Sequence, residues 1–391
     1  MHDPLTDALA GRPAGQQPGW PDPAEVAAVR KELADRPALV AAADVHRLRA
    51  LLGRVAQGGA HVLQAGDCAE DPQECTAGDL ARKAGLLDLL AGRLKLTTHR
   101  PVVRIGRLAG QFAKPRSHPT ERCDGVELPV YRGHLVNGPE PHPARRTPDP
   151  RRLTAGYEAA RRAMDHLGRL APGAPAAAGP PLWTSHEALL LDYELPLLRR
   201  DERGRPLLAS THFPWIGERT RRPDGAHVAL LARVVNPVGC KVGPATTAEE
   251  LRRLCALLDP GREPGRLTLI ARLGADRAAE VLPGLVRAVR TAGHPVVWLC
   301  DPMHGNTVPG PDGLKTRLVP SLVREVEAFQ QAVRAEGGVD GGLHLETTPD
   351  DVTECADHAG GLARVGDKYT SLCDPRLNPA QALAVVSAWR R

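Results

Sequence analysis

Short apolar runs alternate with amphipathic segments along most of this chain. Runs of four or five apolar residues are typical of buried strands, whereas apolar residues recurring every three or four positions are typical of helices. The strand-like runs are residues 61–65, 102–105, 182–185, 208–212, 239–242, 267–271, 296–299 and 342–345. The helix-like segments between and after them are residues 80–94, 152–170, 187–198, 224–232, 248–258, 276–292, 319–335 and 379–389. Eight strand–helix pairs predict an α/β fold, namely a closed parallel (β/α)8 TIM barrel, with an open doubly wound sheet as the alternative.

Two further helical segments, residues 23–35 and 43–57, precede the first strand. We therefore expect an N-terminal tail and helical extension over residues 1–57 and a catalytic barrel over residues 58–391. Residues 114–150 form a connection too long for a routine loop, and long connections of this kind are usually functional. Residues 145–150 and 173–181 are rich in proline and are expected to be surface linkers.

Polar residues stand at or just past the ends of the strand-like runs. Arg272, Asp301, His304, His344 and Glu346 all have this position. Because the carboxyl ends of the strands of a barrel converge on one face, side chains distant in sequence meet there in one pocket. The pattern favours an enzyme.

Composition excludes several other classes. No apolar run approaches the ~20 residues of a membrane span. Only 3% of residues are aromatic and the net charge of +5 is spread along the chain, which argues against nucleic-acid binding. The first twenty residues lack the basic and apolar regions of a secretory signal, so we expect a cytoplasmic protein. In a reducing cytosol the eight cysteines stay thiols, available as ligands or nucleophiles.

A set of cations occupies the predicted strand ends. Arg107, Lys114 and Arg116 follow the second run, Arg219 follows the fourth, Lys241 lies in the fifth and Arg272 ends the sixth. Arginine and lysine on one face can hold phosphorylated anions, although each cation could equally pair with a neighbouring carboxylate. Lys241 stands in an apolar strand and needs a compensating anion.

A second set offers metal ligands. Cys68 follows the first run, His304 the seventh, Glu346 ends the eighth and Asp374 lies in the loop beyond. Sulfur, nitrogen and oxygen donors together suit Mn²⁺, Fe²⁺, Co²⁺ or Zn²⁺. No Cys-x-x-Cys or His-Glu-x-x-His motif is present, so the hypothesis depends on the shared position at strand ends; a lone Cys or His is more often a packing or surface residue.

Several longer motifs resemble the class II (type II) 3-deoxy-D-arabino-heptulosonate 7-phosphate (DAHP) synthase family. The resemblance runs from about residue 63 to the C-terminus. It is carried by QAGDCAE at residues 64–70, GRLAGQFAKPRS at 106–117, TSHEALLL at 184–191, WIGERTR at 215–221, DPMHGNT at 301–307, HLE at 344–346 and LCDPRLN at 372–378.

The resemblance implies a (β/α)8 barrel that condenses phosphoenolpyruvate with erythrose 4-phosphate, the first step of the shikimate pathway. Position by position, it implies that the metal ligands are Cys68, His304, Glu346 and Asp374. It implies a phosphoenolpyruvate site of Arg107, Glu218, Arg219, Lys241 and Arg272. It also implies an aldose-phosphate segment of Lys114, Arg116 and Ser117, and a catalytic set of Lys241, Arg107, Glu187 and His304.

The implied chemistry is metal-dependent, with Mn²⁺ as the expected ion and Co²⁺ or Zn²⁺ as alternatives. The metal would act as a Lewis acid on the aldehyde, and the cations would stabilise developing charge. Water then adds at C2 of the enol phosphate; Glu187, His186 or His212 is expected to orient it, and the sequence does not choose between them.

Two departures from the family pattern leave alternatives open. The chain is too short for all the helices with which longer members bind aromatic amino acids, which suits a specialised, secondary pathway such as antibiotic biosynthesis. His134 stands in Tyr-Arg-Gly-His where the family pattern has Asp, so an amino-aldose phosphate of the aminoshikimate pathway is the alternative substrate. A further alternative is a catalytically idle paralogue that regulates a partner such as a chorismate mutase. By analogy, we expect a homodimer.

Overall fold

The computed structural model of the chain describes residues 9, 11–123, 125–168, 181–311 and 313–391. The start of the expected N-terminal tail and residues 173–180 of the expected linker lie outside the described residues.

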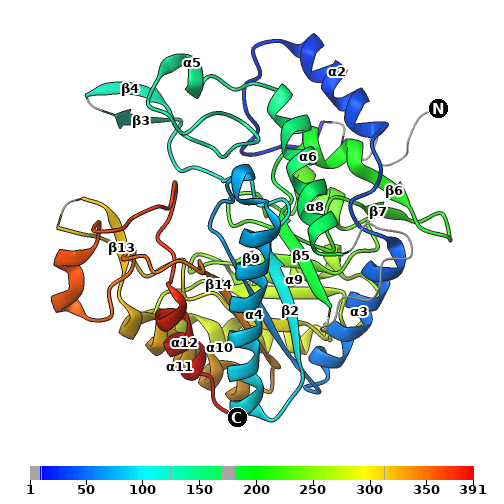
Figure 1. Ribbon diagram of the computed structural model, residues 1–391. Coiled ribbons are helices and arrows are strands. Elements are labelled where there is room, and N and C mark those ends of the chain that lie inside the picture. The colour runs from blue at the N-terminus through cyan, green and yellow to red at the C-terminus, as the bar shows by residue number, and fades with distance from the viewer. Residues whose placement is uncertain (1–8, 10, 124, 169–180, 312) are drawn as a thin grey trace.

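Eight parallel strands close into a barrel, as the sequence predicts, and the open-sheet alternative is wrong (Figure 1). Around the barrel the hydrogen-bonded order is β1-β14-β11-β10-β9-β8-β5-β2. The strands are β1 (His61–Gly66), β2 (Val102–Arg107), β5 (Leu182–Glu187), β8 (Phe213–Ile216), β9 (Val238–Val242), β10 (Leu267–Ala271), β11 (Val297–Cys300) and β14 (Asp340–Glu346).

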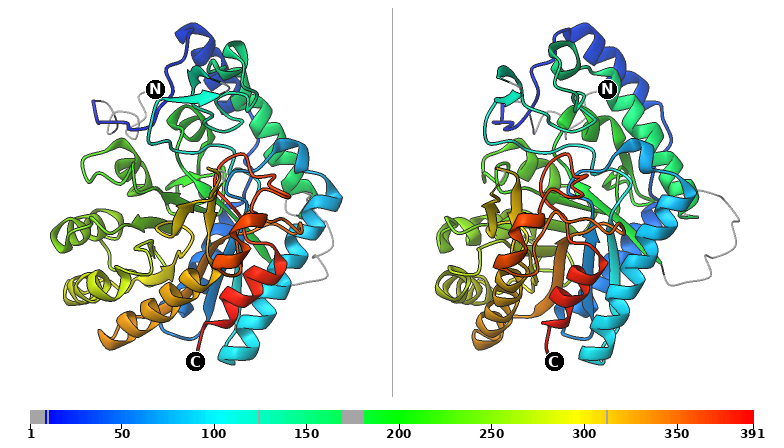
Figure 2. Two further views of the ribbon diagram at one scale, coloured as in Figure 1. Left: turned by 90° about the vertical axis from the view of Figure 1, so that its left-hand side faces the viewer. Right: turned by 60° about the vertical axis from the view of Figure 1, so that its left-hand side comes forward.

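Amphipathic helices surround the strands (Figure 2). They are α4 (Ala77–Thr98), α6 (Arg151–His166), α8 (Ala226–Leu231), α9 (Ala248–Leu258), α10 (Ala278–Thr291), α11 (Val319–Ala335) and α12 (Pro379–Ser387). The buried leucines and valines of α8 to α12, and most of those of α4, form one apolar cluster with outward-facing strand residues such as Leu63, Val242 and Leu269. The buried residues of α6 belong to a second apolar cluster. This outer layer holds the strands in place, so that the loops at their carboxyl ends have a rigid base.

The N-terminal helices are α2 (Pro23–Ala34) and α3 (Ala42–Ala56), close to their predicted bounds. α2 packs on α6. α3 places Leu48, Leu52 and Val55 in the same buried cluster as Val62 and Ile105 of the barrel interior. The helix therefore covers the amino-terminal end of the strands, opposite the end where the active site of a barrel lies.

The fourth barrel strand was predicted at the wrong residues. The apolar run 208–212 does not form it; the strand is β8, a few residues later. Instead β7 (Pro206–Leu208) pairs with β6 (Leu198–Arg200) in an antiparallel hairpin outside the barrel. Two short apolar runs stand here, one on each side of Ser210, Thr211 and His212, and apolar character alone does not say which of them enters the barrel.

The predicted helix 187–198 is also wrong. The segment contains one turn of helix, α7 (Leu191–Glu194), followed by the 3-10 turn η2 (Leu195–Leu197). Pro196 has no N–H to donate and blocks a longer helix. The long connection 114–150 contains local structure that the sequence did not reveal: strands β3 (Thr120–Cys123) and β4 (Val126–Pro129) and the short helix α5 (Pro143–Arg146). A third hairpin, β12 (Thr307–Pro309) with β13 (Lys315–Arg317), follows β11, and 3-10 turns η1 (Pro72–Glu74) and η3 (Ala359–Arg364) complete the loops.

Barrel closure depends on a glycine, which gives a first prediction. Gly342 of β14 pairs with Val62 of β1 and has a φ of 142°. A Cβ at this position would overlap the carbonyl of Val62. We expect Gly342→Ala to lower the free energy of unfolding by about 3 kcal/mol or more, measured by urea unfolding. The control is Gly284→Ala on α10, where a Cβ meets nothing within 4 Å; it should stabilise the helix by about 1 kcal/mol.

Candidate active site

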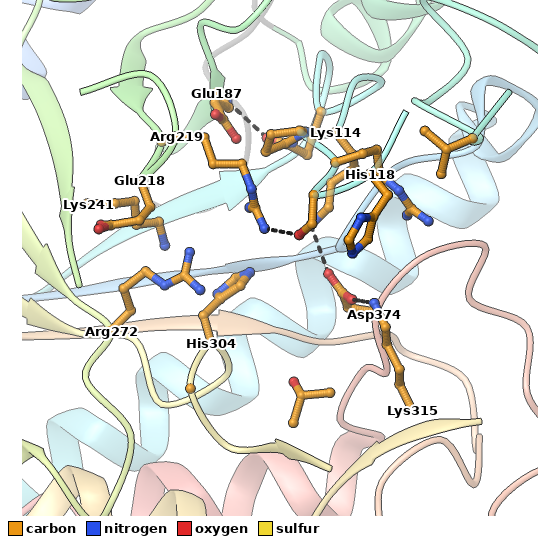
Figure 3. Close-up of a pocket in the computed structure, with 18 of the residues that line it drawn as sticks. Lys114, His118, Glu187, Glu218, Arg219, Lys241, Arg272, His304, Lys315 and Asp374 are labelled. Carbon is orange, nitrogen blue, oxygen red and sulfur yellow. Dashed lines mark hydrogen bonds and ion pairs between the residues drawn. The ribbon is translucent and has the colours of Figure 1, made fainter. Parts of the chain in front are cut away.

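A polar cavity of about 590 Å³ opens at the carboxyl end of the strands (Figure 3). Most of the predicted site residues line it, although they come from distant parts of the chain. They are Arg107, Lys114, Arg116, Ser117, Glu187, Glu218, Arg219, Lys241, Arg272, His304 and Asp374. Cys68 and Glu346 are fully buried next to it. The barrel thus gathers the predicted residues at one end.

Lys241 has the anion that its apolar surroundings require. Its ammonium forms a buried ion pair with Asp301, which follows β11. Burial lowers the pKa of Lys241 to about 8, and the ion pair with Asp301 opposes that shift. Asp301 also accepts a hydrogen bond from His304 Nδ1 at 2.8 Å. Although burial acts to raise it, the pKa of Asp301 lies well below its usual range because of His304 and Lys241.

Arg107 ends β2 and is fixed by several partners. Its guanidinium donates to the carbonyl of Asp67 at 2.9 Å and to Glu346 at 3.2 Å, and it lies over the Trp215 ring. It also contacts His344 Nε2 at 2.6 Å, while His344 Nδ1 lies 2.7 Å from Gln64 Oε1. Arg107 has only donors, so His344 is neutral, accepts from Arg107 and donates to Gln64. Nη2 also donates to the carbonyl of Cys68 at 3.2 Å, so the guanidinium is fixed at the wall of the cavity before any ligand arrives.

Glu346 is the most heavily compensated acid in the site. Its carboxylate lies 3.0 Å from Arg317, 3.2 Å from Arg107, 3.4 Å from Lys114 and 3.4 Å from His304 Nε2. Burial alone would raise the pKa of Glu346. The surrounding Lys114, His304 and Arg317 instead hold it well below its usual range.

Three of the four predicted metal ligands lie together, and the fourth, His304, contacts one of them. Ligand atoms of Cys68, Glu346 and Asp374 are all within 4.8 Å of one another, and His304 Nε2 is next to Glu346. Burial, with Glu346 and Asp374 nearby, raises the pKa of the Cys68 thiol well above its usual value. Nδ1 of His304 contacts Asp301, so Nε2, which lies 3.4 Å from Glu346, is the atom that would ligate a metal ion. A thiol, an imidazole and two acids in one region fit a divalent cation.

Lys114 lies deeper than the sequence suggested. Its Nζ is 3.4 Å from both Glu346 and Asp374, so the ammonium stands among the candidate metal ligands rather than with Arg116 and Ser117. These carboxylates raise its pKa although burial acts in the opposite direction. Arg116 and Ser117 lie at the outer rim, where Ser117 Oγ accepts a hydrogen bond from Arg219 at 2.5 Å.

Of the three residues considered for orienting water, Glu187 lines the cavity. Its Oε1 is buried without a partner among the described residues, and burial raises its pKa, against the effect of Lys114 and Lys241. His186 instead contacts Glu194 at 2.9 Å, and His212 contacts Thr184. Neither imidazole is among the cavity-lining residues.

Three buried glutamates outside the predicted set hold the loops that carry the site. Glu70 accepts from the backbone N–H groups of residues 109, 110 and 111, just after β2. Glu325 accepts from the N–H groups of Leu273 and Gly274, beside Arg272, and from the Asn306 amide, beside His304. Glu354 accepts from the N–H groups of residues 370, 371 and 376, around Asp374.

One of these could have been found in the sequence. Glu325 lies at the helical spacing of the buried residues Leu322, Val326 and Phe329, on the apolar face of α11. A charged residue in that position needs partners. The sequence analysis also missed two cations that line the cavity, Lys315 and Arg317. They lie on the hairpin strand β13, whose sequence pattern did not predict a strand.

A family model described as the Class-II DAHP synthetase family matches residues 5–179 and 174–388. The chain belongs to this family. It is 58% identical over 376 residues to a probable phospho-2-dehydro-3-deoxyheptonate aldolase of Pseudomonas fluorescens, covering 96% of this chain and 94% of that protein. It is 41% identical over 421 residues to a phospho-2-dehydro-3-deoxyheptonate aldolase of Streptomyces coelicolor, covering 95% and 93%. The enzyme class and family predicted from the motifs are therefore confirmed.

A solved structure of phospho-2-dehydro-3-deoxyheptonate aldolase from Francisella tularensis has the same fold. It superposes with a TM-score of 0.53 at 13% identity and covers 92% of each chain. In the present chain, no helix among the described residues is long and apolar enough to cross a membrane.

The contacts of Glu325 give a second prediction. Glu325→Ala leaves the N–H groups of Leu273 and Gly274 without their buried acceptor and frees the loops of Arg272 and His304. We expect faster amide hydrogen exchange at Leu273 and Gly274 and a loss of about 10- to 100-fold in kcat/KM, because the cations are no longer fixed.

The matched control is Glu280→Ala, which removes a largely exposed glutamate from α10. It should change neither quantity. Normal exchange at both amides in Glu325→Ala would show that the loops do not depend on this carboxylate.

Proposed function

We propose that this enzyme condenses phosphoenolpyruvate with erythrose 4-phosphate and water to give DAHP and inorganic phosphate. The observation that supports it best is one cavity in which a row of cations from separate strand ends faces the cluster of Cys68, Glu346 and Asp374, with His304 beside Glu346. Two phosphorylated anions need such a cationic lining. Held side by side, they react at high effective concentration.

In this proposal the inner cations bind phosphoenolpyruvate. Arg107 and Lys241 are buried and held by Glu346 and Asp301, so they are oriented before the ligand binds. Arg272 and Arg219 complete the anion site from neighbouring loops. Glu218 is paired with Arg221 at 2.9 Å, and it therefore acts as an acceptor at the edge of this site. The guanidinium forks match phosphate and carboxylate oxygens.

Arg116 and Ser117 at the rim bind the phosphate of the aldose, with Lys114 beneath them toward the aldehyde end. Because Arg219 already bonds Ser117 Oγ, one arginine borders both anion sites. Its loss is expected to affect both substrates.

Cys68, His304, Glu346 and Asp374 would hold the divalent metal, with Mn²⁺ as the proposed ion. When bound, such an ion supplies Lewis-acid polarisation of the aldehyde oxygen. Asp301 holds the Nδ1 proton of His304 and so keeps Nε2 available as a donor atom. Arg317, fully buried against Glu346, keeps that carboxylate ionised.

Lys114, Arg107 and Lys241 stabilise negative charge on the reacting oxygens while C3 of the enol phosphate bonds to the aldehyde carbon. Water then adds at C2, and phosphate leaves. In this proposal Glu187 orients the water and accepts its proton; its position in the cavity lining and its raised pKa support this role.

The ordinary aldose phosphate is preferred to an amino-aldose. His134, the residue that suggested the amino sugar, does not line the cavity; its Nε2 is 3.9 Å from Asp71. An idle regulatory paralogue is disfavoured because every implied ligand and cation is present. A role in secondary metabolism, a cytoplasmic location, a homodimer and a chorismate mutase partner stay proposals that follow from the family resemblance and the chain's composition.

A third prediction tests the reaction. Purified enzyme, first treated with EDTA and then supplied with Mn²⁺, should release phosphate from phosphoenolpyruvate when erythrose 4-phosphate is present, and it should be inactive before the metal is restored. Turnover is followed by loss of phosphoenolpyruvate absorbance. Turnover with the amino-aldose phosphate alone would contradict the proposed substrate.

A fourth prediction concerns Cys68. Cys68→Ser replaces a soft thiolate by a weak oxygen donor, so we expect at least about 10-fold weaker Mn²⁺ binding, measured by calorimetry, and loss of condensation. Cys255→Ser on α9 is the control, since this thiol is buried away from the cavity. Unchanged metal affinity in Cys68→Ser would exclude the thiolate as a ligand.

A further inference from the structure

Residues 12–17, in the expected N-terminal tail, lie against loops at the carboxyl end of the barrel. The segment contains no helix or strand. Hydrogen bonds join it to the loops after β2, β5 and β8, which are neighbouring strands of the barrel. The carbonyl of Pro13 accepts from the first N–H of α8 at 2.9 Å. The Gln17 side chain donates to the carbonyl of Leu189 and accepts from the N–H of Leu191, both at 2.9 Å. The segment is therefore anchored to the end of the barrel that carries the candidate site.

Gln16, in the middle of this segment, contacts the loop of the proposed aldose-phosphate site. Its Oε1 accepts a hydrogen bond from the backbone N–H of Arg116 at 2.8 Å. Its main-chain carbonyl accepts from the guanidinium of Arg132. The carbonyl of Arg132 in turn accepts from the backbone N–H of Lys114 at 2.9 Å. One residue from outside the barrel thus joins the stretch around Arg116 to the neighbouring stretch around Arg132.

The backbone of Gln16 indicates that its side chain is needed there. Gln16 has a φ of 63°, in the left-handed region, where a residue with a Cβ is strained and a glycine is not. Such strain persists only where other contacts hold the residue in place. A glycine could keep the contact through the carbonyl with Arg132, but it has no oxygen to offer to the N–H of Arg116. The bond to Arg116 therefore accounts for glutamine at this position.

The charges around Gln16 explain why a neutral oxygen suits this place. Arg132 is half-buried and forms no ion pair with another described residue. Burial lowers the pKa of Arg132, and the nearby Arg116 lowers it further. Gln16 supplies oxygen acceptors to this pair of guanidinium-bearing residues without adding a negative charge. The positive charge at the rim of the cavity stays available for a phosphate group.

We propose that Gln16 is a positioning residue of the aldose-phosphate site, which holds the backbone of Arg116 and thereby sets where Arg116 and Ser117 meet the phosphate. This inference rests on the proposed function, and it extends the active site to a part of the chain outside the barrel. Gln16 is not among the residues that line the cavity, so it acts through Arg116. The contacts of Gln17 and Pro13 keep the segment in place while Gln16 makes these bonds.

The first test measures steady-state kinetics of Gln16→Met in the full-length enzyme with Mn²⁺. Methionine has a similar length but no oxygen, so the loop around Arg116 must be ordered by the incoming aldose phosphate. We expect the KM for erythrose 4-phosphate to rise about 10-fold, while kcat and the KM for phosphoenolpyruvate stay within about 2-fold of the wild type. Gln331→Met, at an exposed position of α11, is the matched control and should leave all three constants unchanged.

A second variant separates positioning from folding. Gln16→Gly removes the same acceptor but also relieves the strain of the left-handed backbone. It should raise the KM for erythrose 4-phosphate as Gln16→Met does, with a thermal unfolding midpoint within about 3 °C of the wild type. An unchanged KM in both variants would overturn the proposal.

Amide hydrogen exchange of the ligand-free protein tests the contact without any substrate. The N–H of Arg116 should exchange at least about 10-fold faster in Gln16→Met and Gln16→Gly than in the wild type, and Gln331→Met should show no change. Unchanged exchange at Arg116, an equal rise in both KM values, or a fall in kcat alone would each contradict the positioning role. A wild type that does not condense the two substrates would overturn the proposed function and the aldose role together, while faster exchange at Arg116 would still establish the contact.

Discussion

The charge balance around Glu346 is the interaction on which the candidate site depends. Three cations and one imidazole reach this single buried carboxylate, from β2, from the loop after it, from β13 and from the loop after β11. A buried anion without partners, or buried cations without an anion, would be strongly destabilising. The barrel brings these groups to one point, and mutual neutralisation lets them stay there out of water. Arg107 and Lys114 are therefore held in position by the ion pairs that neutralise Glu346.

Buried carboxylates also hold the loops that carry the site. Glu70, Glu325 and Glu354 each accept at least two backbone N–H groups of a loop that follows a strand. Because they are buried, no water competes for these hydrogen bonds. Backbone N–H groups of these irregular loops are thus hydrogen-bonded to carboxylates, as they would be to carbonyl groups in a helix or strand. Residues that never face the cavity decide where Arg272, His304 and Asp374 point.

Much of this arrangement could be read from the sequence. Period changes between 2 and 3.6 located most barrel strands and the long helices α9 and α11, and motif matching named the residues that the barrel brings together. The fourth strand was misplaced because two short apolar runs stand on either side of Ser210, Thr211 and His212, and only the closed sheet decides which of them pairs in the barrel. The depth of Lys114 could not be predicted either, since it depends on two carboxylates more than 200 positions away. Buried ion pairs between distant loops leave no periodic trace.

The position of α3 determines at which end of the barrel reactants enter the cavity and products leave it. Leu48, Leu52 and Val55 cover the amino-terminal end of the barrel, and the cavity lined by the described residues opens at the carboxyl end of the strands. Both reactants must come in, and both products must go out, past the ribbons β3–β4 and β12–β13, which contribute Thr120, Thr307 and Lys315 to its walls. Changes in these two short ribbons can alter entry and exit while the chemistry beneath them stays the same.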